Sequence, residues 1–203
     1  MSELRVALTF DAEHPSRSGT AAGTADEILS ALADAGVRAS FFLQGRWASA
    51  YPGLARRIAA EGHLVGNHSH YHAPLPLLSL EGIGVDVAES ERRIEDITGV
   101  DPKPWFRCPF GDGADQPSVV SALSALGYRH VDWNVDGEDW CEGRSPATVR
   151  SAVADGTAGA GASAVVLFHT WSAATAGALP DILADLLARG ASFVTAAEVT
   201  DEP

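Results

Sequence analysis

The sequence Leu4-Arg-Val-Ala-Leu-Thr-Phe10 is a short, mostly apolar run that leads directly into Asp11. A run of this length, bounded by polar residues, is typical of a buried strand in a parallel sheet. The next segment, residues 24–35, has helical spacing, and Thr24-Ala-Asp-Glu27 matches a capping box at its start. A second apolar run follows at residues 37–43. Strand, helix and strand in this order predict a parallel β-α-β unit.

The same alternation continues along the rest of the chain. We predict further helices at residues 52–60, 81–98, 117–126, from 146 onward after the N-cap Ser145, and at 180–188. Further strands are predicted at 63–66, up to 106, at 128–133, 164–169 and 191–195. Seven strands that alternate with helices indicate an α/β fold, either a closed or distorted barrel or an open doubly wound sheet. The glycine- and alanine-rich stretch 156–163 is expected to be a flexible connection.

Length and composition indicate a single domain over residues 1–203, since 203 residues with 46% hydrophobic and 20% charged residues suit one globular unit. The formal net charge of −13 argues against nucleic acid and anionic membrane as partners, because phosphates would be repelled. No stretch approaches the ~18 apolar residues of a membrane span. The N-terminus shows no secretion signal, so a cytoplasmic protein is expected, or an extracytoplasmic one if a leader has been removed. The oligomeric state stays open.

Three of the seven histidines fall within Gly66-Asn-His68-Ser-His70-Tyr-His72. If this segment makes one helical turn, His68 and His72 lie on one face and His70 points elsewhere. Neutral imidazoles bind transition metals, so the pair resembles a metal clamp that lacks its carboxylate. The alternative is a hydrophilic loop in which histidines cluster by chance.

Polar residues at the ends of predicted strands indicate where a site would form. In parallel α/β folds, functional residues gather at the carboxyl ends of the strands. The residues of this chain that fall at or just after such ends are Asp11, Asn67, His68, Arg107, Asp139 and His169.

Several of these residues have a chemical role to offer and a plain structural alternative. Asp11 and Glu13 project from the same side of an extended chain, so one could bind metal while the other deprotonates water; both could also be solvated turn residues. Arg107 could orient a carboxylate or form a surface ion pair. His169 ends an apolar strand and is a candidate general acid or a structural histidine. Trp140 lies among carboxylates and could stack on a sugar or fill the core.

Five motifs in order resemble the NodB-homology polysaccharide deacetylases, which form carbohydrate esterase family four. The resemblance extends from Thr9 to about Thr195. The motifs are Thr9-Phe-Asp11, Gly66-Asn-His68 with His72, Arg107-Cys-Pro-Phe-Gly111, Asp139-Trp140 and Leu167-Phe-His169.

The resemblance implies a distorted (β/α)7 barrel and a role for each matching residue. Asp11 would be the catalytic base held by Arg107, and His169 the general acid with a pKa tuned by Asp139. His68 and His72 would bind a divalent metal ion. The residues expected at the substrate are Trp140 and Leu167, around the acetyl methyl group, and Phe110, whose backbone amide would join the oxyanion hole.

One departure from the family pattern concerns the metal. The family places a second aspartate, a metal ligand, where this chain has Ala12. Glu13 is the expected replacement, with His14 and Asp11 as alternatives. Zinc is the expected ion for a site of two histidines and one carboxylate, although cobalt, nickel or iron would also suit it.

The resemblance therefore predicts a metal-dependent hydrolase that removes acetyl groups from N-acetylated or O-acetylated sugars or oligosaccharides. Two alternatives remain. One is hydrolysis of a non-carbohydrate C–N bond, as in a ureide or cyclic imide, and the other is a glycan-binding protein without metal. Cys108 and Cys141 could approach each other, but two free thiols are expected.

Overall fold

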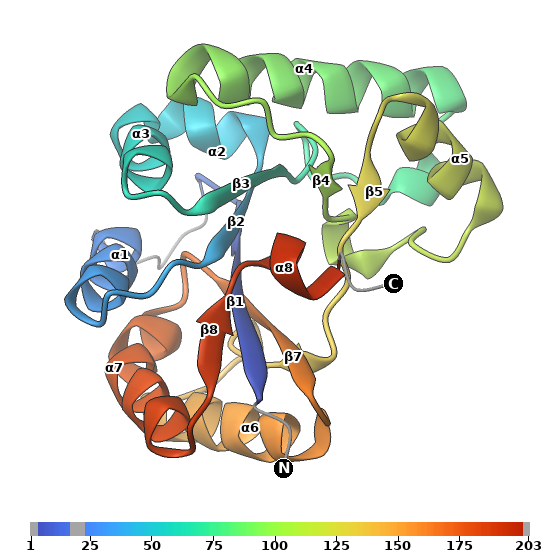
Figure 1. Ribbon diagram of the computed structural model, residues 1–203. Coiled ribbons are helices and arrows are strands. Elements are labelled where there is room, and N and C mark those ends of the chain that lie inside the picture. Colours follow the sequence, from blue (N-terminus) through green and yellow to red (C-terminus); the bar gives the residue numbers. More distant parts are fainter. Residues whose placement is uncertain (1–3, 17–22, 201–203) are drawn as a thin grey trace.

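The predicted first strand is the central strand of the sheet. The computed structural model describes residues 4–16 and 23–200, and β1 (Arg5–Ala12) runs through the middle of the fold (Figure 1). It pairs in parallel with β7 (Ser163–His169) along one edge. On the other edge, β8 (Ser192–Val194) pairs with the first residues of β1, and β2 (Ser40–Leu43) pairs with the last.

The remaining strands extend the sheet to both sides. Beyond β2 come β3 (Leu64–Asn67), β4 (Trp105–Phe106) and β5 (Arg129–His130), and beyond β7 comes β6 (Val135–Asp136). Every strand pair in the described part of the chain is parallel. Among the described residues β5 and β6 do not pair with each other, so the curled sheet stays open between them. This is a distorted (β/α)7 barrel, as the sequence predicts, in a single domain.

The helices surround the curled sheet, as Figure 1 shows. Ala196, at the start of α8 (Ala196–Thr200), packs with Phe42 and Val131, and its backbone N–H donates to Ser40 Oγ at 2.9 Å. The α8 helix therefore lies within the curl of the sheet rather than outside it. Within the described residues, no helix is long and apolar enough to cross a membrane. The helices are α1 (Thr24–Asp34), α2 (Gly45–Ala50), α3 (Pro52–Ala60), α4 (Leu80–Thr98), α5 (Pro117–Ala125), α6 (Pro146–Gly159), α7 (Ala173–Ala188) and α8 (Ala196–Thr200), with short 3-10 turns at Leu75–Leu77 and Pro109–Gly111.

Side chains along the central strands point alternately to the core and to the face that carries the candidate site. Phe10 lies between Phe41 and Phe168 with ring centroids 5.0 and 5.4 Å apart, in the core that joins the sheet to its outer helices. Each of these fully buried rings stabilises the fold by about 1.5–3 kcal/mol. Because successive side chains of a strand point to opposite faces, Asp11 faces away from this core.

The ends of several elements differ from the prediction. Gly23, not Thr24, is the N-cap of α1, and no side chain caps that helix, so the capping box is not formed. The α7 helix begins at Ala173 and contains Pro180, because Ser172 caps it by accepting from the Thr175 amide. A proline suits a first helical turn best, and this preference made residue 180 look like a start.

Two other segments were also assigned wrongly. The predicted strand 128–133 forms only the two residues of β5, and β6 follows as a separate strand. Part of the stretch 156–163 belongs to α6, which continues to Gly159. A Cβ on Gly156 would lie 2.5 Å from a methyl carbon of Val135, so glycine here allows α6 to pack directly on β6. Close packing therefore accounts for Gly156, whereas a Cβ on Gly159 or Gly161 would meet no atom within 4 Å.

Candidate metal centre and active site

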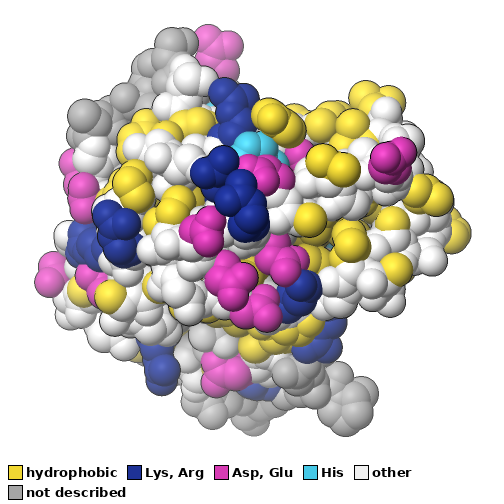
Figure 2. Space-filling view, turned by 90° about the horizontal axis from the view of Figure 1, so that it is seen from above, with side chains coloured by type: hydrophobic (Ala, Val, Ile, Leu, Met, Phe, Trp, Pro, Cys, Tyr) yellow, Lys and Arg dark blue, Asp and Glu magenta, His cyan; other side chains and the backbone are white. Residues whose placement is uncertain are grey.

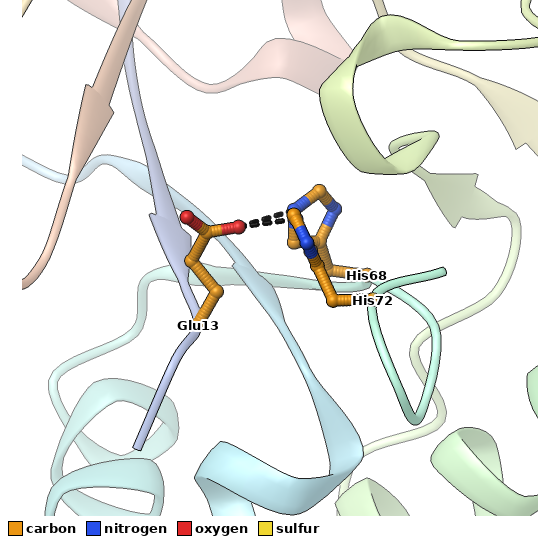
Figure 3. A group of neighbouring side chains, drawn as sticks. All are labelled: Glu13, His68 and His72. Atoms are coloured by element: carbon orange, nitrogen blue, oxygen red, sulfur yellow. Dashed lines mark hydrogen bonds and ion pairs between the residues drawn. The ribbon is translucent and has the colours of Figure 1, made fainter. Parts of the chain in front are cut away.

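Three side chains from two strand ends meet in the buried group that Figure 3 shows. Glu13 follows β1, while His68 and His72 follow β3. His68 Nε2 lies 3.3 Å from Glu13 Oε2 and 3.1 Å from His72 Nε2, and Glu13 Oε2 also contacts His72 Nε2. Each residue is at most 7% exposed. The three possible ligand atoms lie within 4.8 Å of one another, so a single metal ion could contact all of them. We call Glu13, His68 and His72 the metal group.

The two histidines come together through a loop rather than through one turn of a helix. Ser69 and His72 both adopt left-handed conformations, with φ of 63° and 58°. Side chains of the loop itself hold this shape: Asn67 Oδ1 accepts from the Ser69 amide, and Ser69 Oγ accepts from the His72 amide, each at 2.9 Å. The loop turns back on itself, and His68 and His72 consequently face the same point.

A buried carboxylate on α4 fixes the middle of the loop. The two carboxylate oxygens of Asp86 accept from the amides of His70 and Tyr71, each at 3.0 Å. His70 does not join the group of ligand atoms. Its ring packs beside Gly45, where an added Cβ would lie only 2.5 Å from Nδ1. As expected, His70 lies between two candidate ligands without being one.

The protonation of His68 indicates that the group suits a cation. His68 Nδ1 lies 2.9 Å from the Arg107 carbonyl oxygen, which can only accept, so Nδ1 carries the hydrogen. In the neutral ring, Nε2 then presents a lone pair to the Glu13 carboxylate. Two lone pairs at 3.3 Å require a positive charge between them, either a proton or a metal ion. The donor set therefore fits a divalent metal.

The titration properties of the three residues agree with this electrostatic description. Burial would raise the pKa of Glu13, but hydrogen bonds with His68 and His72 outweigh it and hold the pKa well below its ordinary value. Burial would lower the pKa of His68, but the charges of Asp11 and Glu13 outweigh it, so the pKa is raised. For His72, burial dominates and lowers the pKa.

A second group joins Asp11 to the completely buried Arg107, which follows β4. Arg107 Nη1 donates to Asp11 Oδ1 at 3.0 Å and to Thr9 Oγ1 at 2.8 Å, and Nε donates to the Val131 carbonyl at 3.1 Å. The other Asp11 oxygen lies 3.5 Å from His68 Nε2. Arg107 thus holds the Asp11 carboxylate at the edge of the metal group.

A third group joins His169, at the end of β7, to Asp139 in the loop after β6. His169 Nδ1 lies 2.7 Å from Asp139 Oδ1, and the His169 amide donates to Oδ2 at 2.9 Å. Thr175 Oγ1, from the first turn of α7, also donates to Asp139 Oδ2. Burial would lower the pKa of His169, but the contact with Asp139 outweighs it and raises the pKa to about 9. His169 Nε2 lies 3.9 Å from Glu13 Oε1, so this imidazole adjoins the same centre.

The three residues expected to contact the substrate differ in how they lie relative to the metal group. The Phe110 ring packs against His72 at 4.4 Å between centroids, and the side chain is 64% exposed, so it borders the metal group and faces solvent. Leu167 is buried on β7, two residues before His169 and on the same face. Trp140 is 53% exposed, and among the described residues its ring nitrogen has one hydrogen bond, to Asp136 at 3.4 Å. The structure does not bring Trp140 into contact with the metal group.

Some residues that contact the site were not predicted from the sequence. Trp171 Nε1 donates to Glu13 Oε1 at 3.1 Å, and its place two residues after His169 could have indicated a role. Thr175 and Asp86 lie in helices, where nothing in their spacing distinguishes them. His14 Nε2 lies 3.2 Å from Glu13 Oε1, on the side away from His68. Cys108 and Cys141 are both free thiols, as expected.

This arrangement of strand-end residues agrees with the comparisons to known proteins. The family model described as polysaccharide deacetylase matches residues 1–131. The chain therefore belongs to the polysaccharide deacetylase family.

Individual relatives share the sequence and the fold over almost the whole chain. The peptidoglycan-N-acetylglucosamine deacetylase PgdA of Listeria monocytogenes is 32% identical over 198 residues, which are 98% of this chain and 39% of that protein. The chain thus spans less than half of this relative. The peptidoglycan deacetylase PdaC from Bacillus subtilis aligns with a TM-score of 0.82 and 29% identity, covering 98% of this chain and 91% of that one.

A third relative belongs to the same family but is described as inactive. A carbohydrate esterase family 4 pseudoenzyme from Bacillus anthracis aligns with a TM-score of 0.86 and 27% identity, covering 98% of this chain and 66% of that one. Membership of the family and the shared fold do not by themselves establish activity.

Proposed function

We propose that this chain is a metal-dependent hydrolase that removes acetyl groups from N-acetylated or O-acetylated sugars. The observation that carries the proposal is the convergence of three groups at one edge of the sheet. The Glu13–His68–His72 group contacts Asp11, which Arg107 holds, and it adjoins His169, which Asp139 holds.

Each residue has a task that its surroundings support. A divalent ion held by Glu13, His68 and His72 would polarise the acetyl carbonyl and make water more acidic. Asp11, held by Arg107, would accept a proton from the attacking water. The amide of Phe110 is the expected donor to the oxyanion that develops on the acetyl oxygen. His169, protonated because Asp139 raises its pKa, is placed to give a proton to the departing amine or hydroxyl.

Acetate release tests the reaction and its metal. The chain should release acetate from an N-acetylglucosamine oligomer, lose this activity when a chelator removes the metal, and regain it with added zinc, cobalt or nickel. The His68→Ala variant should show neither activity nor metal by elemental analysis. Full activity of His68→Ala would contradict the metal assignment.

The substitution at Ala12 supports a second candidate, a glycan-binding protein without metal. The family's aspartate is absent there, and one structural relative is described as a pseudoenzyme. Elemental analysis of freshly purified protein separates the candidates. Absence of bound metal, together with no rise in melting temperature on adding zinc, would favour the binding protein.

A further alternative is hydrolysis of a cyclic ureide or imide by the same groups. A substrate panel that shows activity on ureides and none on acetylated sugars would favour it.

A further inference from the structure

The two carboxylate oxygens of Glu13 have different neighbours. Oε2 faces the histidines, 3.3 Å from His68 Nε2 and in contact with His72 Nε2. Oε1 is turned away from both rings, as Figure 3 shows, and it accepts a hydrogen bond from Trp171 Nε1 at 3.1 Å. One oxygen of this candidate ligand therefore points toward the histidine nitrogens, and the other is held by a tryptophan.

The N–H of Trp171 differs in kind from the other neighbours of Oε1. An indole nitrogen can only donate, so it always requires an acceptor. His14 Nε2 lies 3.2 Å from Oε1, but an imidazole nitrogen can donate or accept. His169 Nε2 is 3.9 Å from Oε1, which is beyond hydrogen-bond distance. The chemistry of the indole thus sets the direction of the bond that holds Oε1.

The sheet brings Trp171 to this position. The parallel register of β1 and β7 pairs Asp11 with the last residue of β7, and the Thr170 amide continues the ladder by donating to the Asp11 carbonyl at 3.0 Å. Two positions beyond that pair, Trp171 stands opposite Glu13. The next residue, Ser172, caps α7 with its side chain. The backbone of Trp171 is therefore fixed by a strand ladder on one side and a helix cap on the other.

Burial gives this hydrogen bond its weight. Glu13 is 4% exposed, so most partners of its carboxylate must come from the protein. Five of the seven histidines are buried as well, and little histidine surface shows on the face drawn in Figure 2. A glutamate side chain has several rotatable bonds, and ordering them costs conformational entropy. A fixed donor at Oε1 orders the side chain during folding rather than on metal binding.

We propose that Trp171 is a positioning residue for the metal group, and that its N–H keeps Glu13 Oε1 away from the metal so that Oε2 alone is the ligand. Catalytic zinc sites combine three protein ligands with a position left open for water or substrate. A carboxylate that used both oxygens would crowd that position. The inference rests on the metal role that the proposed function gives to Glu13, but metal binding tests it without turnover.

Zinc affinity separates the N–H of Trp171 from the packing of its ring, which lies 5.0 Å from the His169 ring. Trp171→Phe keeps an aromatic ring without a donor, and Trp171→Leu has neither. In competition titrations with a chromogenic chelator, we expect both variants to bind zinc about 10–100-fold more weakly than the wild type, as is usual when the support of a ligand is lost. Wild-type zinc affinity in Trp171→Phe would overturn the proposal.

Trp105→Phe is the matched control. Trp105 lies on β4 with its ring centroid 4.3 Å from Arg129 Cζ, and within the described part of the chain no hydrogen bond or ring contact joins it to the metal group. The same chemical change outside the site should leave the zinc affinity unchanged. An equal loss of affinity in the two phenylalanine variants would show a general effect on the fold and would also overturn the proposal.

A cobalt spectrum reports how many atoms coordinate the ion, and a purely structural role of Trp171 would not change that number. Cobalt(II) with four or five ligands absorbs visible light more strongly than cobalt(II) with six, so its spectrum is diagnostic of geometry. In Trp171→Phe the released Oε1 is free to turn toward the ion. We therefore expect weaker absorption per bound cobalt than in the wild type. An unchanged spectrum, even with weakened binding, would contradict the proposed role.

The wild-type protein gives a test that does not depend on the folding of a variant. The indole N–H signal of Trp171 in NMR spectra, assigned through its proximity to the His169 ring, should exchange with water more slowly than that of the exposed Trp140 and should move when zinc binds. Exchange as fast as that of Trp140, or a signal that zinc does not move, would count against the proposal.

These measurements separate the role of Trp171 from the proposed function. Zinc binding that Trp171→Phe weakens would support the positioning role even if no acetate is released. Acetate release with equal zinc affinity in the wild type and Trp171→Phe would leave the proposed function standing and overturn the positioning role.

Discussion

The last residues of β1 and the residue after it point to opposite faces of the sheet, with Ala12 on one face and Asp11 and Glu13 on the other. Ala12 is completely buried among apolar side chains of the core. A carboxylate at this position would lose its hydration without gaining a hydrogen-bond partner. Asp11 and Glu13 project to the other face, toward His68. Glu13, and not the residue at position 12, therefore supplies a carboxylate on the face where the histidines lie.

Removal of the Glu13 carboxylate should remove the metal. In Glu13→Ala we expect metal affinity to fall by more than about 100-fold, because loss of a direct ligand exceeds the usual effect of a supporting residue. Titration with zinc, followed by elemental analysis after gel filtration, measures this loss.

Two neighbours serve as controls for that experiment. His14→Ala and Asp11→Asn should keep the metal, and Asp11→Asn should lose activity because a base is missing. Metal retained by Glu13→Ala but lost by His14→Ala or Asp11→Asn would reassign the third ligand.

The contact between Asp139 and His169 predicts a defect in proton transfer when the charge of Asp139 is removed. Asp139→Asn keeps the shape of the side chain but removes the charge that favours protonated His169, and its NH2 group replaces one of two oxygens that accept hydrogen bonds here. We expect kcat to fall by about 100-fold, within the usual range for general acid catalysis, while metal content stays the same. Steady-state kinetics on an N-acetylated oligomer would show it, and an unchanged kcat would exclude His169 as the acid.

At the scale of the elements, the loop after β3 depends on α4. Asp86 is 5% exposed and supplies both oxygens to loop amides, whereas Asp96 on the same helix lies at the surface and pairs with Arg92. The helix thereby acts as a support for a loop that contains two candidate metal ligands.

Asp86→Ala should destabilise the fold and weaken metal binding together. It leaves the buried His70 amide without an acceptor, which costs about 1–3 kcal/mol in the free energy of unfolding, and removes the acceptor of the part-buried Tyr71 amide as well. Urea unfolding with and without zinc measures both effects. Asp96→Ala is the control and should change neither by more than about 0.5 kcal/mol. Equal effects of the two substitutions would contradict the supporting role of Asp86.

At the scale of the whole molecule, buried histidines make the fold sensitive to acid. Burial lowers the pKa of His130 to about 4, and its Nδ1 accepts from the Cys108 amide at 3.2 Å. The pKa of His63 is also lowered by burial, and its Nδ1 accepts from the Ala39 amide at 3.0 Å. Protonation of either ring nitrogen would remove the acceptor of that backbone amide.

The sign of the pH dependence follows from these shifts. The unfolded chain binds a proton at His130 below about pH 6.5, whereas the folded chain does so only below about 4, so this contribution to stability is present above 6.5 and disappears on acidification toward 4. For His130 alone the loss is up to about 3 kcal/mol. His130→Asn, which keeps an acceptor but does not titrate, should flatten the decline in urea unfolding between pH 6.5 and 4. An identical decline in the variant would contradict this account.

The alternation of elements was predictable because it depends on local patterns. Apolar runs of strand length, such as residues 4–10, and helical periods, such as 81–98, are determined by neighbours in the sequence. Element ends were less predictable. Pro180 lies inside α7 and Gly156 inside α6, since packing and the Ser172 cap outweigh the local preferences of these residues.

The sequence by itself determined the parallel α/β architecture and the chemical types available at its strand ends, because both depend on residue order and hydrophobic period. Only the tertiary structure decided which of these side chains meet. Glu13 and His68 are 55 positions apart in sequence, and Arg107 and Asp11 are 96 apart, yet parallel pairing of β1 through β4 brings both pairs to one edge. Local hydrogen bonds from Asn67 and Ser69 hold the left-handed turns at Ser69 and His72. The support from Asp86 comes from another element, so no local pattern could predict it.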